Sequence, residues 1–303
     1  MSLHIKYRPT SLSKIRGNSD TISILEGMLS DIETCPHSFL FFGESGTGKT
    51  TLARILSDRL GCKGSDYREI NSADFRGIDT IREIINNSQF KPIEGTCRVW
   101  VLDEIHKATT DAQNALLKIL EDTPKHIYFV LCTTDPQKLL STIKGRCSQF
   151  QTRPLSDSQM YGLLRKIVKD ENDVLESEVF DQIILDSLGR PRNALQILEQ
   201  VLKVSPDRRI EIAKQSAEQQ SQAIELCRAL LKRSSWKVVK VILNGLKDQD
   251  AEGIRRLLLA YSQSILLKEE NEMAARIIEE LWDPLYNVGW PGLVYCVYSI
   301  VKK

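Results

Sequence analysis

The stretch that decides the fold of this chain is Ser38-Phe39-Leu40-Phe41-Phe42-Gly43-Glu44-Ser45-Gly46-Thr47-Gly48-Lys49-Thr50. Its apolar first part is typical of a buried strand, and residues 43–50 fit the phosphate-loop pattern G-x-x-x-x-G-K-[ST] in full. Apolar residues at helical spacing continue over residues 50–60. A strand, a glycine-rich turn and a helix in this order are the context in which the pattern binds phosphate, so the sequence predicts a nucleotide site here.

The loop residues suit the chemistry of a bound triphosphate. Glycines allow the backbone to curl so that successive N–H groups point at phosphate oxygens, and the helix that starts there adds the positive end of its dipole. Lys49 would reach the β- and γ-phosphates, and the Thr50 hydroxyl would ligate Mg²⁺. A glycine-rich turn that binds nothing is the alternative. The residues predicted to bind the nucleotide from this loop are Gly43, Glu44, Ser45, Gly46, Thr47, Gly48, Lys49, Thr50 and Thr51.

A second motif lies about fifty residues further on, where Val99-Trp100-Val101-Leu102-Asp103-Glu104 reads as an apolar strand that ends in two carboxylates. Asp103 is suited to hold Mg²⁺, and Glu104 to orient or deprotonate the attacking water. The alternative is a solvated acidic pair at a strand end. The second carboxylate favours an ATPase that hydrolyses its nucleotide. Because no His or Cys lies nearby at metal spacing, His106 is predicted to start a helix and not to bind a metal.

Strands and helices are predicted to alternate in the first half of the chain, which indicates a parallel sheet flanked by helices. The strand patterns lie at 38–42, 99–102 and 127–132. The helical patterns between them, after that of residues 50–60, lie at 78–87 and 111–120.

After residue 150 the patterns are helical, and turn signals at 153–157 and 205–207 divide the chain. The apolar periods lie near 223–231, 236–246, 254–267 and 274–282, with a buried terminal helix expected within 284–301. The predicted domains are 1–152, 153–205 and 206–303.

Composition limits the class of protein. The 303 residues hold 41 Lys and Arg against 40 Asp and Glu, so no overall field attracts nucleic acid and any DNA contact needs local placement of charge. The 42% hydrophobic and 27% charged residues are typical of a soluble globular protein. Seven Cys without a C-x-x-C pair indicate free thiols in a reducing compartment. With no signal-peptide pattern and no membrane-spanning run, we expect a cytoplasmic protein with no membrane partner.

Further motifs carry a resemblance to a known family. Together with Asp103-Glu104-Ile105-His106, the phosphate loop resembles that of the AAA+ ATPases. Thr133-Thr134-Asp135-Pro136-Gln137-Lys138-Leu139, followed by Gly145-Arg146-Cys147, resembles the clamp-loader ATPases, above all the gamma/tau subunit of bacterial DNA polymerase III. Residues 71–82 are instead similar to the small subunits of replication factor C, the same family in archaea and eukaryotes. The resemblance covers 1–152 and extends through Arg192, whereas beyond 206 it rests on helical content and length.

This resemblance implies an α/β AAA+ P-loop domain at 1–152, a helical lid domain at 153–205 and an all-α C-terminal collar domain for oligomerisation at 206–303. Tyr7, Arg8 and Pro9 match the stretch that packs against the adenine. Thr134 falls at the first sensor position, Arg146 matches the finger that enters the neighbouring subunit's ATP site, and Arg192 matches the second sensor, with Arg190 as the alternative. Arg76 and Arg82 would face DNA, with a plain charged helix face as the alternative.

The function implied is that of a clamp-loader motor subunit. ATP binding with Mg²⁺ would open a sliding clamp on primer-template DNA, and hydrolysis stimulated by clamp and DNA would release both. Its partners would be neighbouring copies and a distinct subunit in a spiral hetero-oligomer. The alternatives are a scaffold subunit that binds ATP without hydrolysing it, and another AAA+ DNA remodeller.

The sequence also departs from the gamma/tau pattern. The four-cysteine zinc module is absent between Cys62 and Tyr67, so zinc is not expected, and Gly145 stands where the finger motif has Ser. Without a tau-type extension, a compact loader, reduced or phage-encoded and then in the host cytoplasm, is the expectation.

Overall fold

The computed structural model describes residues 2–71, 78–220 and 222–302, and it divides into two compact units. Residues 5–159 form one, here named the sheet unit, and residues 160–303 together with residues 1–4 form the other, the helical unit. The predicted division into 1–152, 153–205 and 206–303 stays a prediction.

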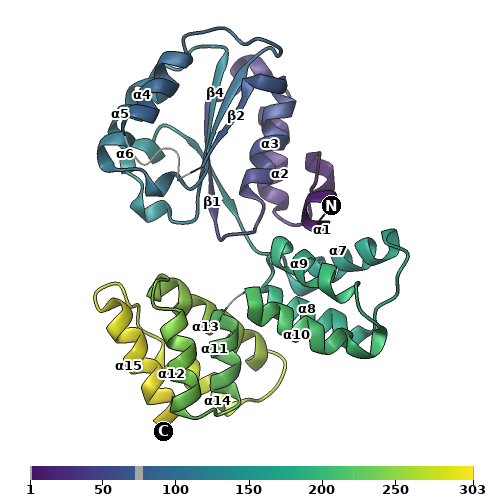
Figure 1. Cartoon of the computed structure of the whole chain (residues 1–303). Coiled ribbons are helices and arrows are strands. Elements are labelled where there is room, and N and C mark those ends of the chain that lie inside the picture. Colours follow the sequence, from purple (N-terminus) through teal and green to yellow (C-terminus); the bar gives the residue numbers. More distant parts are fainter. Residues whose placement is uncertain (1, 72–77, 221, 303) are drawn as a thin grey trace. The chain divides into compact units, whose positions relative to one another are not determined.

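The described residues of the sheet unit form a five-stranded sheet in the order β2-β3-β4-β1-β5, with every neighbouring pair parallel (Figure 1). The strands are β1 (Ser38–Gly43), β2 (Tyr67–Ile70), β3 (Arg98–Leu102), β4 (Ile127–Thr133) and β5 (Ser148–Thr152). Because all strands run the same way, their carboxyl ends lie at one edge of the sheet and their amino ends at the other. These are named the carboxyl edge and the amino edge. The parallel sheet predicted from the sequence is confirmed.

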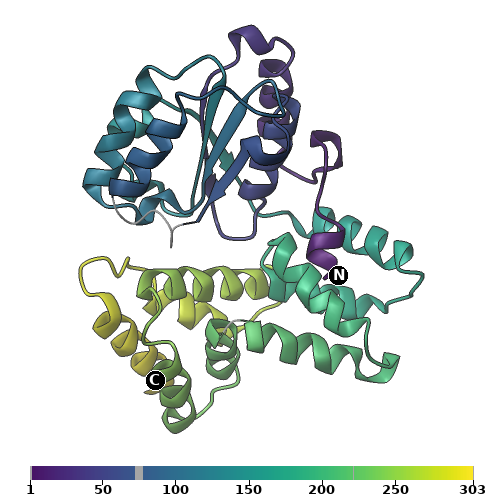
Figure 2. The same ribbon diagram turned by 45° about the horizontal axis from the view of Figure 1, so that its top comes forward.

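Helices cover both faces of this sheet in both views (Figures 1 and 2). The α-helices of the sheet unit are α2 (Ser19–Met28), α3 (Lys49–Arg59), α4 (Ile78–Asn87), α5 (Thr110–Glu121) and α6 (Ser141–Lys144), and α1 (Leu3–Lys6) has its first two residues in the helical unit and its last two in the sheet unit. Short 3₁₀ turns lie at Leu12–Lys14, Ile32–Thr34, Gly64–Asp66, Ile105–Lys107 and Pro136–Lys138.

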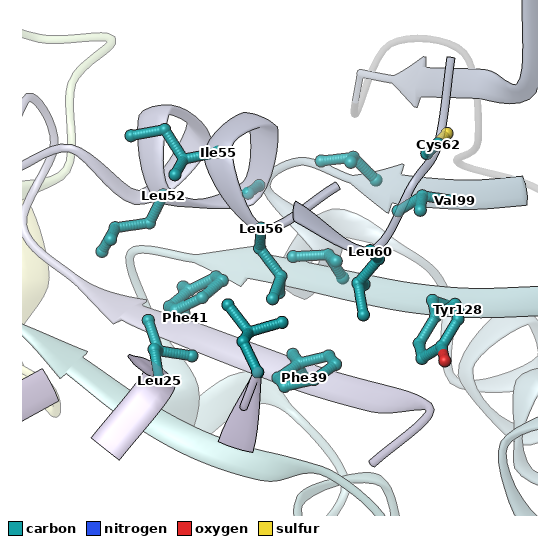
Figure 3. Packing of buried hydrophobic residues seen from close by; sticks show 14 of the residues in the cluster. Leu25, Phe39, Phe41, Leu52, Ile55, Leu56, Leu60, Cys62, Val99 and Tyr128 are labelled. Carbon is teal, nitrogen blue, oxygen red and sulfur yellow. The ribbon is translucent and has the colours of Figure 1, made fainter. Parts of the chain in front are cut away.

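Alternate residues of the central strands pack against opposite helical layers. Phe39 and Phe41 lie in a buried cluster with Leu25 of α2 and Leu52 and Leu56 of α3 (Figure 3). The strand residue between the two phenylalanines, Leu40, packs in the other cluster, with Ile81 and Ile84 of α4 and Leu116 of α5. Both faces are therefore buried, which explains why β1, β3 and β4 are continuous apolar runs in the sequence.

A buried ion pair fastens the amino edge of the sheet. Arg98, the first residue of β3, donates to Asp66 Oδ1 from Nη2 at 3.3 Å and to the Asn87 carbonyl at 2.9 Å. Asp66 is fully buried and also accepts the backbone N–H groups of residues 93–95. Burial by itself would raise the pKa of Asp66, but these amides and the Arg98 guanidinium lower it to about 2.

The helical unit contains α7 (Asp157–Asp170), most of which lies beyond the boundary, and the helices that follow it. These are α8 (Ser177–Ser187), α9 (Pro191–Val201), α10 (Arg209–Gln220), α11 (Gln222–Leu231), α12 (Trp236–Gly245), α13 (Ala251–Leu266), α14 (Glu272–Glu280) and α15 (Gly289–Lys302), with a 3₁₀ turn at Pro206–Arg208. A buried network joins three of them, because Asp186 of α8 accepts hydrogen bonds from Arg228 of α11 and Tyr261 of α13.

The terminal helix corrects the sequence expectation in one respect. A buried helix within 284–301 was expected, but α15 begins at Gly289 and buries one stripe only, formed by Leu293, Val297 and Ile300. Tyr295 and Tyr298 on its other side are exposed. Because most residues of the segment are apolar, the sequence pattern does not show which of them are buried. The three buried residues are spaced by four and three positions, so they lie on one face of the helix. Among the described residues, no helix is long and apolar enough to cross a lipid bilayer.

Candidate nucleotide-binding site

The phosphate loop connects the end of β1 to the start of α3 at the carboxyl edge. Gly43 has φ +150°, and a Cβ there would lie 2.1 Å from the Thr152 carbonyl oxygen of β5, so the packing of the sheet requires glycine. Gly48 has φ +105° but open space around its Cβ position, so its requirement is conformational. Packing against β5 therefore requires glycine at position 43, whereas the space around Gly48, just before α3, is open. Backbone N–H groups that bind phosphate need such open space.

Lys49 is held inside the loop. It is 5% exposed, and its Nζ donates to the carbonyls of Gly43 and Glu44, each at 2.9 Å. Thr47 braces the same loop, because its hydroxyl donates to the Glu44 carbonyl at 2.7 Å and lies 2.8 Å from the Thr152 hydroxyl. The positive charge of Lys49 is thus fixed at the carboxyl end of β1, where the phosphate-loop pattern places a lysine that binds phosphate.

Thr50 and Asp103 provide a pair of oxygen ligands. The Thr50 hydroxyl donates to Asp103 Oδ2 at 3.1 Å, which joins α3 to the end of β3. Burial and the neighbouring Glu104 carboxylate raise the pKa of Asp103. Mg²⁺ prefers oxygen ligands and takes few of them from the protein beside the phosphates and water, so this pair fits Mg²⁺·ATP. The described residues hold no group of three or more His, Cys, Asp or Glu side chains that could bind a metal, and the absence of zinc stays a prediction.

Glu104, the residue after Asp103, is hydrogen-bonded to Thr134. The Thr134 hydroxyl donates to Glu104 Oε2 at 2.8 Å, which links the ends of β3 and β4. Glu104 has φ +55°, a left-handed conformation that non-glycine residues rarely adopt. Such backbone positions persist where the surrounding structure imposes them, commonly at functional sites. The carboxylate is therefore oriented by the fold and by one hydrogen bond from the adjacent strand end.

His106 belongs to the same cluster, although sequence reasoning gave it no role. It lies in the 3₁₀ turn after β3, with Nδ1 3.0 Å from the Thr133 hydroxyl and 3.3 Å from Glu104 Oε2. Burial lowers the pKa of this imidazole. The sequence position of His106 could have indicated this role. It lies two residues after Glu104, and a tight turn at the end of a strand keeps the residues that follow close to the same edge of the sheet.

Arg146 lies at the opposite edge of the sheet. It follows α6 and precedes β5, and it lines a cavity of about 400 Å³ together with Ser38, the first residue of β1. Its Nη2 donates to Glu121 Oε2 at 2.9 Å and its Nη1 to the Thr142 carbonyl at 3.1 Å, while the buried Nε lacks a partner among the described residues. At about 3.3 Å per residue, β1 places Gly43 roughly 16 Å from Ser38, so Arg146 does not serve the loop of its own chain.

The remaining predicted residues are not brought to this cluster by the described contacts. Tyr7, Arg8 and Pro9 follow α1 and are partly buried. Arg192 is exposed on the first turn of α9 in the helical unit. Arg82 is exposed on α4 and pairs with Asp79 at 3.2 Å, whereas Arg76 lies outside the described residues. The structure therefore unites Lys49, Thr50, Asp103, Glu104 and Thr134.

Sequence comparison finds subunits of DNA polymerase III among the proteins similar to this chain. A family model described as DNA polymerase III, delta subunit, matches residues 65–156. The DNA polymerase III subunit gamma/tau of Mycobacterium tuberculosis (H37Rv) is 34% identical over 230 residues, which cover 68% of this chain and 40% of that protein. The DNA polymerase III subunit tau of Escherichia coli (K12) is 30% identical over 262 residues, or 78% of this chain and 40% of that protein. The chain thus spans about 40% of the length of these relatives.

Comparison with solved structures gives the same fold. The RuvB Holliday junction branch migration motor of Thermotoga maritima superposes with a TM-score of 0.60 at 18% identity, covering 74% of this chain and 79% of that one. At this identity the likeness shows the fold alone. It agrees with a parallel sheet that carries a phosphate loop and is followed by helices.

Proposed function

Because this chain belongs to the clamp-loader subunits of the AAA+ P-loop ATPases, we propose that it is a motor subunit that binds and hydrolyses ATP to load a sliding clamp onto primer-template DNA. One observation carries the proposal. The carboxyl edge holds Lys49, the Thr50–Asp103 pair and the Thr134–Glu104 pair, whereas Arg146 stands at the amino edge. A chain with both a phosphate site and an arginine that cannot reach it is suited to work beside further subunits.

The residues of the carboxyl edge have separate tasks in this proposal. Lys49 and the loop amides bind the triphosphate, and Thr50 and Asp103 hold Mg²⁺, which when bound offsets the negative charge of the phosphates. Glu104 accepts the proton of the attacking water, or orients that water, while Thr134 keeps its carboxylate in place. Phosphoryl transfer depends mainly on positioning and charge, and this arrangement supplies both.

Arg146 acts on the neighbouring subunit's ATP. Its distance from its own loop excludes a role there, and its guanidinium lies at a surface cavity. An arginine supplied in trans is worth about 10³–10⁵ in turnover in well-studied NTPases. We therefore propose that copies of this chain, with a distinct partner subunit, form a spiral in the cytoplasm in which each finger completes the next site.

DNA and clamp contacts follow from assembly. With 41 basic and 40 acidic side chains, the chain attracts phosphates only through local charge, and we propose that Arg82, together with Arg76, supplies it. Repetition around a spiral multiplies weak contacts, so affinity for primer-template DNA should rise steeply with assembly and fall with salt. Tyr7, Arg8 and Pro9 at the adenine, and Arg192 at the phosphates, complete the proposed nucleotide contacts.

The test is the dependence of ATP hydrolysis on its two effectors. Turnover is measured with a ring-shaped clamp and primer-template DNA together, with each alone, and with duplex DNA. The proposal expects the highest rate with both. The matched control is Glu104→Gln, which should keep ATP affinity but lower turnover by about 10²–10⁴-fold, because only the proton acceptor is removed.

Three outcomes would contradict the proposal. ATP binding without turnover in any mixture would indicate a scaffold subunit. Stimulation by duplex DNA with no effect of clamp would indicate another DNA remodeller. Turnover of Glu104→Gln at the wild-type rate would remove Glu104 from the mechanism.

A further inference from the structure

One surface of the helical unit combines basic and aromatic side chains. Residues 232–247 contain five basic residues and no acidic residue, although the whole chain has 41 basic and 40 acidic residues. All five basic residues are exposed, and one of them, Arg233, pairs with Glu272 at 3.3 Å. The segment includes α12, so this part of the helical unit carries a local positive charge that the net charge of the chain does not reveal.

Helix α12 turns this charge toward solvent because its apolar residues occupy the opposite face. Val239, Ile242 and Leu243 are buried, whereas Lys237 and Lys240 are exposed. Residues three positions apart are neighbours on the surface of a helix. The two lysines can therefore contact the same ligand.

Helix α15 packs beside α12 in the same unit and adds aromatic rings (Figure 1). The rings of Trp236, at the start of α12, and Tyr298 meet edge to face with their centroids 5.0 Å apart. Lys302 Nζ lies 5.8 Å from the centroid of the Tyr298 ring, and Tyr295, one turn earlier, is 71% exposed. These side chains form one surface, here named the α12–α15 face, which consists of Trp236, Lys237, Lys240, Tyr295, Tyr298 and Lys302.

Single-stranded DNA presents both kinds of group that this face can bind. Its phosphates are negative, and its unpaired bases have flat surfaces that stack on aromatic side chains. An acidic peptide would use the lysines but not the exposed ring of Tyr295. Two copies of the chain docked through the same face would place lysines against lysines, which is unfavourable.

We propose that the α12–α15 face binds single-stranded DNA, with Lys237 and Lys240 at phosphates and Tyr295 stacked on a base. This contact lies in the helical unit and goes beyond the DNA contact proposed for Arg76 and Arg82. It involves neither the nucleotide site nor a clamp.

The role of the lysines is tested by fluorescence anisotropy with a labelled oligothymidylate. Lys237→Ala/Lys240→Ala should weaken binding about 10-fold at about 0.1 M salt, and it should flatten the slope of log affinity against log salt by about 1.4, because each neutralised phosphate of a single strand contributes about 0.7. The matched control is Lys166→Ala/Lys169→Ala, which removes the same charge from exposed positions of α7 in the same unit. The control should leave affinity and slope unchanged.

The role of the aromatic ring is tested with Tyr295→Ala. This variant should bind oligothymidylate about 5-fold more weakly or worse, because one stacking contact is lost, while its salt slope stays that of the wild type. Tyr295→Phe keeps the ring and should bind like the wild type. An abasic oligonucleotide and a DNA duplex offer no free base to stack, so neither should distinguish Tyr295→Ala from the wild type. Circular dichroism checks the fold of each variant.

Three results would overturn the inference. The first is equal affinity of Lys237→Ala/Lys240→Ala and its α7 control. The second is oligothymidylate binding by Tyr295→Ala at the wild-type level, which would indicate a surface for polyanions in general. The third is a loss of self-association in sedimentation velocity with unchanged oligothymidylate binding, which would identify the face as an interface between copies. Since these measurements contain neither ATP nor clamp, a failure of clamp-stimulated hydrolysis would reject the proposed function alone.

Discussion

The two edges of the sheet differ in how their polar groups are paired. At the carboxyl edge Thr50 bonds Asp103 and Thr134 bonds Glu104, so the side chains arrange one another before a ligand arrives. At the amino edge the guanidinium of Arg146 holds Glu121, while its buried Nε meets no acceptor in the described parts of the chain. The polar side chains of the carboxyl edge therefore orient one another, whereas Arg146 at the amino edge keeps one nitrogen without a partner among the described residues, as its proposed role in a neighbouring subunit requires.

The amino edge itself contains two unlike arginines. Arg98 is 7% exposed and paired with the fully buried Asp66, and removal of one partner of such a pair is strongly destabilising. The side chains of Arg146 and Glu121 are 31% and 61% exposed, and exposed ion pairs contribute about 0–1 kcal/mol. Arg98 is thus needed for the stability of the sheet unit, whereas the ion pair of Arg146 costs little to break.

The largest effect is expected from Lys49→Ala, which removes the cation of the carboxyl edge. Affinity for ATP should fall by about 100-fold or more, because hydrogen bonds to charged groups are worth about 1.5–3 kcal/mol each. Titration calorimetry measures it, with the circular dichroism spectrum as the control for folding. If the variant kept its affinity for ATP, Lys49 would not be needed to bind the nucleotide. The carboxyl edge would then not be the binding site that its paired side chains indicate.

Arg146→Ala should leave ATP affinity unchanged and lower turnover by about 10³-fold or more. The lost charge belongs to the neighbour's site, so mixing is the decisive measurement. Subunits that carry Lys49→Ala but retain Arg146 should restore part of the activity when added. If mixed oligomers show no rescue, the amino edge does not act in trans.

Asp66→Ala sharpens the contrast between the two arginines. It should lower the free energy of unfolding by about 3–5 kcal/mol, because Arg98 and three backbone amides lose their acceptor. Since the pKa of Asp66 is lowered to about 2, its contribution is full above pH 5 and is lost as the pH falls toward 2. Urea unfolding of wild type and variant should therefore converge in acid, and a constant difference would argue against the ion pair.

The smallest effect is expected from Glu121→Ala. Loss of an exposed pair should change the unfolding free energy by less than about 1 kcal/mol and turnover by a few-fold at most. Unfolding and ATPase assays on the same preparation suffice. If Glu121→Ala lowered turnover as much as Arg146→Ala, Glu121 would be needed to orient the arginine. The side chains of the amino edge would then depend on one another as strongly as those of the carboxyl edge.

The sequence predicts the parts of the fold that are buried on both sides. The strands β1, β3 and β4 appear as apolar runs, and the helix at 78–87 is found with its observed bounds. No strand was predicted at β2 or β5. Both lie at the ends of the sheet with one neighbour each, and Arg68, Glu69, Gln149 and Gln151 interrupt their apolar pattern.

The residues of the candidate site also fall into a part that the sequence predicts and a part that it does not. The phosphate loop and the Asp103-Glu104 pair are local patterns, so the sequence reveals them directly. The pairing of Arg146 with Glu121 joins residues 25 apart, and that of His106 with Thr133 joins residues 27 apart. Such contacts depend on which helix lies beside which strand, and no spacing within one element encodes them.

The Leu3 backbone N–H donates to Glu199 Oε2 of α9 at 3.1 Å, and this contact bears on the order in which the parts of the chain can fold during synthesis. The sheet unit is inserted between two parts of the helical unit, so residues 5–159 can emerge and fold before the partner of Leu3 exists. At about 5–20 residues per second, a ribosome needs roughly 2–8 s to extend the chain from residue 159 to residue 199. During that interval the first residues have no docking surface on α9. Closure of this long-range contact within the helical unit is therefore a late event of biosynthesis, which follows the synthesis of the phosphate loop.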